Sequence, residues 1–168
     1  QLIERKGVIY LLDAWREHHL EYPHDNLLIV GTGPLKESYI QDFGSGNNIL
    51  FTGAIDYSEI YKYYAISDVF VIPTLEDNWS LVVPEAMSCG LPIACSIYNG
   101  CYPELVQEGR NGVLFDPLKK QTIEKALAIF HSVDLKRYGE ESKLIEQSYN
   151  PQQTAQNIYN AVSAILNK

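Results

Sequence analysis

Two carboxylates with seven residues between them bracket a short apolar run in "LEDNWSLVVPEAMSCG", residues 75–90. Asp77 comes before the run, Glu85 follows it, and Glu76 adds a third acidic group beside Asp77. Because an ionised carboxylate accepts hydrogen bonds through two oxygens, it can bind neighbouring hydroxyl groups of a polyol. The plainer alternative is that Glu76 and Asp77 only favour the dipole of a following helix, and that Glu85 is solvated.

The same stretch predicts a helix that begins near Ser80, a residue type favoured as an N-cap. The first N–H groups of a helix have no partner within it, so we expect free donors on Leu81, Val82 and Val83. Such donors, at the positive end of a helix dipole, suit a phosphate group. Together with the carboxylates, they indicate a ligand that carries hydroxyl groups on either side of a diphosphate.

A glycine-rich turn, "VGTGP" at residues 30–34, offers a second place for a ligand. Gly31 and Gly33 let the backbone approach a bound molecule closely. A dinucleotide-binding fingerprint would need a third glycine at the position of Lys36, so this motif alone is weak. A tight turn from a strand into a helix explains the two glycines equally well.

Lys6, in "ERKG", supplies a cation in an acidic chain. A helix follows Gly7, so we expect Lys6 at the same edge of the fold as the other loops, where it could hold a leaving diphosphate. Arg5 would then point elsewhere. The alternative is a solvated charge at the start of a helix.

The chain has 168 residues, 46% of them hydrophobic, which suits one domain over residues 1–168 with a sizeable core. Its net charge of −8 argues against a nucleic-acid partner or an anionic membrane surface, since both attract clustered Lys and Arg. No apolar run is long enough to span a membrane, and "QLIERKG" lacks a secretory signal. We expect a soluble, cytoplasmic domain.

The three cysteines, Cys89, Cys95 and Cys101, lack the paired spacing of a zinc site. Their odd number and apolar surroundings predict reduced thiols, two of them as small core residues. The four histidines are scattered along the sequence, so we expect them at the surface or in packing rather than as metal ligands.

Apolar runs rich in β-branched residues predict strands at 26–31, 48–53, 68–73, 91–96 and 111–115. The runs do not alternate with polar residues, as in a parallel sheet covered on both faces. Helical spacing predicts helices at 7–22, 34–43, 58–67, 84–90, 120–133, 135–148 and 151–167. This order predicts an α/β fold, a doubly wound Rossmann-like parallel sheet flanked by helices, with a helical C-terminal tail. Because a helix comes so early, we expect the first strand to be missing upstream.

Taken together, several segments resemble the C-terminal, donor-binding half of a retaining glycosyltransferase with the GT-B fold, of family 4. They are "KGVIYLLDA", "LLIVGTGP", "ILFTGAIDYSEIYKYYAISDVFVIPTLEDNWSLVVPEAMSCGLPIAC" and "GCYPELVQEGRNGVLFDP", and the match covers nearly the whole chain. That family carries an acidic residue and a glutamate with seven residues between them, the E-x7-E motif. Asp77 and Glu85 occupy these two positions.

The resemblance implies transfer of a sugar from a nucleoside-diphosphate sugar to an acceptor hydroxyl, such as that of a glycan or a lipid-linked sugar. It implies neither a metal ion nor another cofactor. The acceptor site, and any contact of the full-length protein with the inner face of a membrane, would belong to an N-terminal half outside this chain. The domain alone should therefore bind a nucleotide weakly and catalyse nothing.

The resemblance also assigns roles to individual positions. Lys6 would bind the diphosphate as it leaves, Asp77 would hold hydroxyls of the donor sugar, and Glu85 would hold the ribose. The other donor-binding positions it implies are Gly31, Gly33, Ala54, Ile55, Glu76, Asn78, Trp79, Ser80, Leu81 and Val82.

Three positions depart from the family pattern. Asp77 is one methylene shorter than the usual glutamate, and Glu76 beside it could substitute. Gln1 stands where an arginine usually binds phosphate. Ser80 replaces a glycine, which would narrow the space above the sugar.

Other functions stay open at the level of sequence. A GT-B epimerase or phosphorylase shares the architecture but not the paired acidic motif. An NAD-binding domain is disfavoured by the missing third glycine. A non-catalytic relative would keep the fold after losing its chemistry, an alternative that Gln1 in place of arginine favours.

Overall fold

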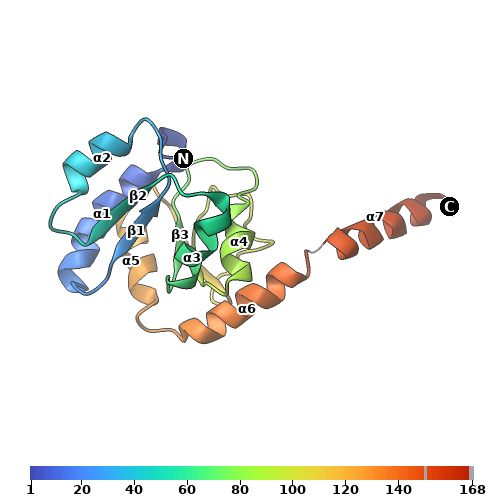
Figure 1. Ribbon diagram of the computed structural model, residues 1–168. Coiled ribbons are helices and arrows are strands. Elements are labelled where there is room, and N and C mark those ends of the chain that lie inside the picture. Colours follow the sequence, from blue (N-terminus) through green and yellow to red (C-terminus); the bar gives the residue numbers. More distant parts are fainter. Residues whose placement is uncertain (150, 167–168) are drawn as a thin grey trace.

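Parallel strands alternate with helices along the chain, and the strands form from its apolar, β-branched runs (Figure 1). The computed structural model describes residues 1–149 and 151–166. The strands are β1 (Leu27–Val30), β2 (Ile49–Gly53), β3 (Phe70–Ile72), β4 (Ile93–Ser96) and β5 (Gly112–Phe115). Each lies inside a predicted strand, so these predictions are confirmed, with ends up to two residues shorter.

The described strands form two parallel sheets. β1 pairs with β2, with Leu27 opposite Ile49. The second sheet has the order β3–β4–β5, with Ile93 between Phe70 and Gly112. The α/β class and the parallel direction are confirmed. The expected single continuous sheet is split, because no described strand lies between β1 and β3 to pair with both.

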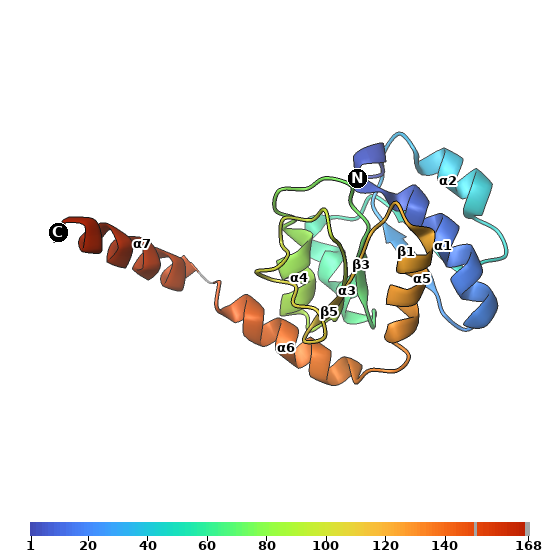
Figure 2. The same cartoon turned by 180° about the vertical axis from the view of Figure 1, so that it is seen from behind.

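Helices cover both faces of the sheets. They are α1 (Val8–Glu21), α2 (Lys36–Phe43), α3 (Ile60–Ala65), α4 (Val82–Ser88), α5 (Lys120–Ile129), α6 (Leu135–Gln147) and α7 (Pro151–Leu166), with short 3-10 turns η1 (Glu4–Lys6) and η2 (Tyr57–Glu59). In Figure 1, α3 and α4 lie in front of β3, and the view from behind shows α1 and α5 on the opposite side (Figure 2). The predicted helices are confirmed, with ends shifted by a few residues.

Each face of the sheets has its own hydrophobic core, and β4 contributes to both. Ala94 packs into the core that includes α1 and α5. Its neighbours Ile93 and Cys95 pack into the core that includes α3 and α4. Successive side chains of a strand point to opposite faces, and all three are fully buried. The doubly wound arrangement therefore follows from the continuous apolar run in this strand.

The last two described helices run away from the sheets. α6 packs on α4 and adds Ile145 to the second core. α7 stands apart from the rest of the domain in both views (Figures 1 and 2), and its apolar side chains are exposed. The predicted helical tail is confirmed over 151–166, and residue 167 of that prediction lies outside the described residues. Among the described helices, none combines the length and the apolar content needed to cross a bilayer.

Candidate functional site

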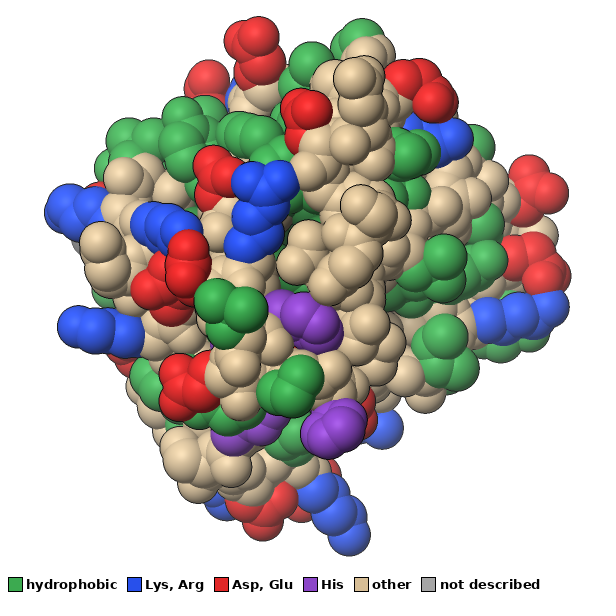
Figure 3. All heavy atoms as spheres, turned by 90° about the vertical axis from the view of Figure 1, so that its left-hand side faces the viewer, with side chains coloured by type: hydrophobic (Ala, Val, Ile, Leu, Met, Phe, Trp, Pro, Cys, Tyr) green, Lys and Arg blue, Asp and Glu red, His purple; other side chains and the backbone are tan. Residues whose placement is uncertain are grey.

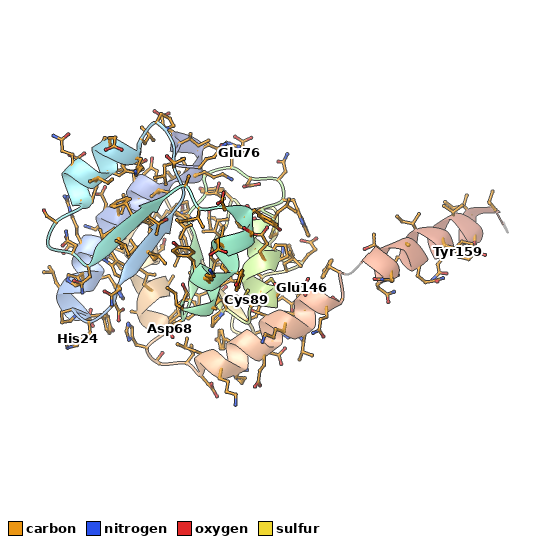
Figure 4. All side chains as sticks on the ribbon, in the orientation of Figure 1. His24, Asp68, Glu76, Cys89, Glu146 and Tyr159 are labelled. Carbon is orange, nitrogen blue, oxygen red and sulfur yellow. The ribbon has the colours of Figure 1, made fainter. Side chains whose placement is uncertain are left out.

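Lys6 and Asp77 meet at the edge of the sheets where the strands end. Figure 4 shows Glu76, which follows β3, at this edge, and it shows Asp68 and His24, which precede β3 and β1, at the opposite edge. The Nζ atom of Lys6 forms an ion pair with Oδ2 of Asp77. The predicted meeting of these two loops is therefore confirmed, as expected for the carboxyl ends of parallel strands.

The segment that carries Lys6 is fastened to the loop after β3. The N–H of Leu75 donates to the carbonyl oxygen of Arg5 over 2.9 Å. Gly7 has a φ of 63°, and a Cβ placed on it would lie 2.1 Å from the carbonyl oxygen of Pro73. Only glycine fits this position. Gly7 therefore lets the two segments approach closely enough for Lys6 to reach the loop.

The Asp77 carboxylate is largely enclosed, with 15% of its side chain exposed. Burial opposes its ionisation, but hydrogen bonds to the carboxylate outweigh that effect and hold the pKa of Asp77 below its ordinary value. The donors are Lys6, the hydroxyl of Ser80 and the N–H of Trp79. Asp77 is therefore a fixed negative charge at neutral pH.

Glu76 does not take the place of Asp77. Its side chain is exposed, whereas Asp77 faces the ammonium group of Lys6. Arg5 lies beside the same loop, with Nη1 3.5 Å from the carbonyl oxygen of Glu76. Arg5 therefore contacts the backbone at Glu76 and not the Asp77 carboxylate that Lys6 meets.

A second loop, after β4, supports the loop that holds Asp77. The N–H of Gly100 donates to the carbonyl oxygen of Asp77 over 2.8 Å, and Nδ2 of Asn99 donates to Oγ of Ser80 over 3.0 Å. A Cβ on Gly100 would lie 1.9 Å from the carbonyl oxygen of Asn78, so the loops touch through their backbones. The sequence does not predict this support, since an Asn-Gly pair indicates a turn but not the segment that the turn packs against.

The helix after the Asp77 loop begins later than predicted. Leu81, not Ser80, occupies the cap position of α4, and no side chain caps the helix. The N–H of Val83 is not free, because it donates to the carbonyl oxygen of Ser80 over 3.0 Å. Only the N–H groups of Leu81 and Val82 lack a partner among the described residues. Two of the three N–H groups that were predicted to be free are therefore free, and the third is not.

The outer side of this loop is open. Ser80 is 4% exposed and its hydroxyl turns inward to Asn99, so it does not narrow the space above the loop, contrary to expectation. Asn78 is exposed, as are Trp79 at 42% and Leu81 at 68%. A ligand can therefore reach the backbone of these predicted donor-binding positions.

Both oxygens of Glu85 accept hydrogen bonds from tyrosines of neighbouring elements. Tyr64 on α3 donates to Oε2 over 3.0 Å, and Tyr57 on η2 donates to Oε1 over 3.4 Å. Burial, together with the nearby charge of Glu85, raises the pKa of Tyr64, so this hydroxyl stays a neutral donor. The carboxylate is oriented rather than freely solvated, and it keeps lone pairs for a further ligand. Nothing in the spacing of the tyrosines predicts these contacts.

Gly31 and Gly33, which follow β1, lie against the N-terminal segment of the chain. A Cβ on Gly33 would lie 2.3 Å from the carbonyl oxygen of Leu2, and the N–H of Leu2 donates to the carbonyl oxygen of Thr32 over 2.9 Å. Gly31 has a φ of 128°, which a side chain would strain. The structure thus favours the tight-turn alternative for this pair.

Ala54 and Ile55 lie beside the Glu85 end of the site. They follow β2 and line a hollow of about 530 Å³. The same loop leads into η2, where Tyr57 reaches Glu85. The predicted position of these two residues near the site is therefore consistent with the fold.

The cysteines behave as core residues and free thiols. Cys95 and Cys101 are fully buried, and Cys89 is exposed. Burial raises the pKa of Cys95 to about 12, so its thiol is neutral and unreactive. The prediction of two core cysteines is confirmed.

Two of the histidines, His18 and His131, lie close together at the edge opposite Lys6, in packing as expected. Oδ2 of Asp25 lies 2.8 Å from Nε2 of His18 and 2.8 Å from Nε2 of His131. Figure 3 shows histidine side chains close together on one face of the molecule. This donor set could hold a divalent metal. In the structure the three groups are partners of one another, and they join α1, the turn before β1 and the residues after α5.

Comparisons with known proteins place the chain among glycosyltransferases. The family model described as "Glycosyl transferases group 1" matches residues 1–132. Sulfoquinovosyl transferase SQD2 of Arabidopsis thaliana is 35% identical over 118 residues, which are 68% of this chain and 23% of that protein. A glycosyltransferase of Haemophilus influenzae is 30% identical over 158 residues, which are 88% of this chain and 43% of that protein.

Solved structures show the same fold. Sucrose-phosphate synthase from Thermosynechococcus elongatus matches with a TM-score of 0.78 at 24% identity, over 98% of this chain and 43% of its own. Anabaena HepE in complex with UDP matches with a TM-score of 0.79 at 23% identity, over 98% of this chain and 47% of its own. The chain thus spans less than half the length of these four relatives. It belongs to the group 1 glycosyltransferase family, and its fold is that of the C-terminal half of a GT-B enzyme.

Proposed function

We propose that this domain binds the nucleoside-diphosphate sugar of a retaining hexosyltransferase, which transfers the sugar to a hydroxyl of a glycan or lipid-linked acceptor. The observation that carries the proposal is the pairing of Lys6 with Asp77 beside the free N–H groups of Leu81 and Val82. This arrangement sets a cation and two donors next to a carboxylate, which suits a diphosphate joined to a polyol. The Anabaena relative, whose structure contains UDP, supports a nucleotide as part of the ligand.

In the proposed reaction, the bond between the anomeric carbon and a diphosphate oxygen breaks. The acceptor oxygen forms the new bond on the same face of the sugar, and its proton passes to the departing diphosphate or to water. Negative charge grows on the diphosphate, so a cation placed beside it lowers the barrier. Lys6 would leave Asp77 and bind the diphosphate oxygen that departs from the sugar. The Asp77 carboxylate would then accept hydrogen bonds from hydroxyls of the sugar, and Glu85 would accept hydrogen bonds from the ribose hydroxyls.

Lys6 and the free N–H groups supply positive charge at the diphosphate, and we therefore propose that the reaction needs no metal ion. The full-length enzyme should keep its activity in excess EDTA. A loss of activity that Mg²⁺ or Mn²⁺ restores would show that Lys6 does not suffice. We place the enzyme in the cytoplasm, which suits its three free thiols, with any contact to the inner face of the membrane made by the acceptor half.

Isothermal titration calorimetry of this domain with UDP, GDP, ADP and NAD tests the proposal. We expect weak binding of one nucleoside diphosphate, weaker binding to the Lys6→Ala variant, no preference for NAD, and no turnover without the acceptor half. Lys120→Ala is the matched control, since Lys120 pairs with Glu17 away from the site. If no nucleoside diphosphate binds, or if Lys6→Ala binds as tightly as the unmodified domain, the proposed site is wrong.

A further inference from the structure

Three side chains that can bind a metal ion converge at the edge of the sheets opposite Lys6. The carboxylate of Asp25 lies between the imidazoles of His18 and His131, and one ligand atom from each residue lies within 4.8 Å of the other two. We propose that these residues bind one divalent transition-metal ion such as Zn²⁺. The ion joins α1, the turn before β1 and the segment after α5. It takes no part in sugar transfer, so this site is independent of the proposed function.

The distances between the ligand atoms suit a bound zinc ion. Zinc binds imidazole nitrogen and carboxylate oxygen at about 2.0–2.2 Å, so two ligand atoms of a tetrahedral site lie roughly 3.3–3.6 Å apart. Oδ2 of Asp25 lies 2.8 Å from Nε2 of each of the two histidines. Each of these pairs must therefore separate by only about 0.5–0.8 Å to admit the ion, a distance that small rotations of the side chains supply.

The chemistry of the donors selects the kind of metal. Imidazole nitrogen suits zinc, copper, iron and nickel, whereas calcium and magnesium bind oxygen ligands. Two imidazoles and one carboxylate hold zinc in known sites and leave a fourth position for water. Each Nε2 now donates a hydrogen bond to the carboxylate oxygen, which can only accept. In a neutral imidazole the hydrogen can instead sit on Nδ1, and the Nε2 lone pair is then available to the metal.

The backbone holds all three ligand residues in place. His18 lies in the last turn of α1, and 3% of its side chain is exposed. The N–H of Asp25 donates to the carbonyl oxygen of Tyr22 over 3.1 Å, and the N–H of His131 donates to the carbonyl oxygen of Ala128 over 3.1 Å. Groups that are already ordered lose little conformational entropy when a ligand binds, so this arrangement favours affinity for the ion.

Aromatic rings pack against both imidazoles. The ring of Tyr22 stacks on that of His131 with centroids 3.9 Å apart, and on that of His18 with centroids 4.7 Å apart. The ring of Trp15 lies 5.1 Å from that of His18. An apolar shell of this kind limits the access of solvent to a metal site. The outer side stays open to a hydrated ion, since 38% of the His131 side chain and 30% of the Asp25 side chain are exposed.

Metal binding at this site should stabilise the fold. α1 and α5 pack on each other and contribute to the same hydrophobic core. An ion bound by His18 and His131 links the ends of these two helices to the turn that holds Asp25. The three ligands come together only in the folded chain, and a ligand that binds only the folded state stabilises it. The ion therefore acts as a clip at the edge of the sheets away from the donor site.

Isothermal titration calorimetry of the chain without an affinity tag tests the proposal, with ZnCl₂ as the probe. We expect one equivalent of Zn²⁺ to bind, and to bind roughly tenfold or more tightly than Mg²⁺. His131→Ala and Asp25→Asn should each weaken Zn²⁺ binding about tenfold or more, as losses around metal sites do. Circular dichroism checks that both variants fold. His24→Ala is the matched control, because His24 is exposed and lies outside the ligand group.

Thermal unfolding gives a second readout. Zn²⁺ at roughly 100 times its dissociation constant should raise the Tm of the unmodified chain and of His24→Ala by about 5–10 °C. The increase should be far smaller in His131→Ala, whatever the Tm of that variant without metal. In the absence of metal, His131→Ala should bind a nucleoside diphosphate as tightly as the unmodified chain does, because the two sites are separate.

The opposite results are equally clear. The proposal is wrong if the unmodified chain does not bind Zn²⁺, if Mg²⁺ binds as tightly, or if His131→Ala binds Zn²⁺ with unchanged affinity. Cys89→Ser should also leave Zn²⁺ affinity unchanged, and a loss of binding in that variant would place the ion on the exposed thiol instead. Weaker nucleotide binding by His131→Ala would contradict the separation of the two sites. Failure of the unmodified chain to bind any nucleotide would count against the proposed function alone.

Discussion

The hydroxyl of Tyr64 on α3 donates a hydrogen bond to Oε2 of Glu85 on α4 over 3.0 Å. Tyr64 is 8% exposed and belongs to the core that packs α3 and α4 on β3 and β4. Glu85 lies in the first turn of α4, close to the loop that holds Asp77. The packing of the core thus sets the direction of a carboxylate in the candidate site.

Replacing Tyr64 by Phe removes this hydrogen bond and keeps the ring. We expect the free energy of unfolding to fall by about 1.5 kcal/mol, since a bond to a charged acceptor contributes roughly 1.5–3 kcal/mol and Tyr57 remains as a second donor. Nucleotide affinity should fall as well, because the carboxylate is less well oriented. Urea unfolding and calorimetry measure the two effects.

The matched control is Tyr63→Phe, because the Tyr63 hydroxyl makes no hydrogen bond within the part of the chain that the structure describes. This variant should change stability and nucleotide affinity little. If both substitutions have the same effect, the hydrogen bond to Glu85 does not matter.

The order of strands and helices follows from local sequence pattern, which explains how much of the fold could be predicted. Continuous apolar runs such as residues 91–96 indicate strands buried on both faces, and β4 has that environment. The meeting of Lys6 and Asp77 was predictable as well, because Lys6 lies just before α1, and the helices of a parallel α/β fold begin at the edge where the strands end. Both inferences depend on chain order and not on the direction of any side chain.

What the sequence could not predict depends on contacts between distant loops. Ser80 has the right type for a helix cap, but its hydroxyl accepts from Asn99 instead, because Gly100 lets the two loops touch. Gly33 looks like a ligand-binding glycine, but Leu2 fills the space beside it. In each case a residue distant in the sequence makes the contact that the local pattern assigns to a helix cap or to a ligand.

The ionisation of Asp77 should make stability depend on pH. Its pKa is lower in the folded chain than in the unfolded one, so its contribution to stability is present above the ordinary value near 3.8 and is lost as the pH falls through the folded value. We expect Asp77→Asn to be less stable than the unmodified domain at pH 7, and the difference to shrink on acidification. Urea unfolding at several pH values between 7 and 3 measures it.

A difference in unfolding free energy that stays constant over this pH range would show that the charge of Asp77 is not stabilised by the fold. Glu76→Gln is the control, because it changes an exposed neighbour that makes no ion pair among the described residues. At pH 7 its free energy of unfolding should equal that of the unmodified domain.

The close contact between Gly100 and Asn78 can be tested by adding a side chain at position 100. In Gly100→Ala the new Cβ would lie 1.9 Å from the carbonyl oxygen of Asn78, so the loop around Asp77 must move. We expect nucleotide binding to fall at least tenfold, since catalytic and binding groups need placement within about 0.5 Å. Calorimetry gives the affinity, and circular dichroism shows whether the fold persists.

Gly109→Ala is the control for that substitution. A Cβ on Gly109 meets no atom within 4 Å, and the variant incurs only the cost of a side chain at a φ of 75°, about 1–2 kcal/mol. It should lose stability and keep nucleotide affinity. The reverse pattern, with binding lost in Gly109→Ala and kept in Gly100→Ala, would contradict the role assigned to the contact between the two loops.

Lys6 should matter most for turnover. In the full-length enzyme, Lys6→Ala should lower kcat by roughly 100–1000-fold, the range seen when one donor to a developing negative charge is removed. The substitution also leaves Asp77 without its ion pair, so some stability should be lost. Steady-state kinetics and thermal unfolding, each with Lys120→Ala as the control, separate the two effects.

Comparing turnover with binding then assigns the step at which Lys6 acts. If Lys6 binds the diphosphate equally in the ground state and the transition state, the variant raises KM and leaves kcat unchanged. If Lys6 stabilises charge that appears only as the bond to the sugar breaks, kcat falls and nucleotide affinity falls far less. The ion pair with Asp77 favours the second result, because Lys6 must give up one carboxylate to bind the diphosphate and gains most when its negative charge is greatest. If kcat and KM are both unchanged, the leaving diphosphate is bound by another cation, for which Arg5 beside the same loop is the candidate.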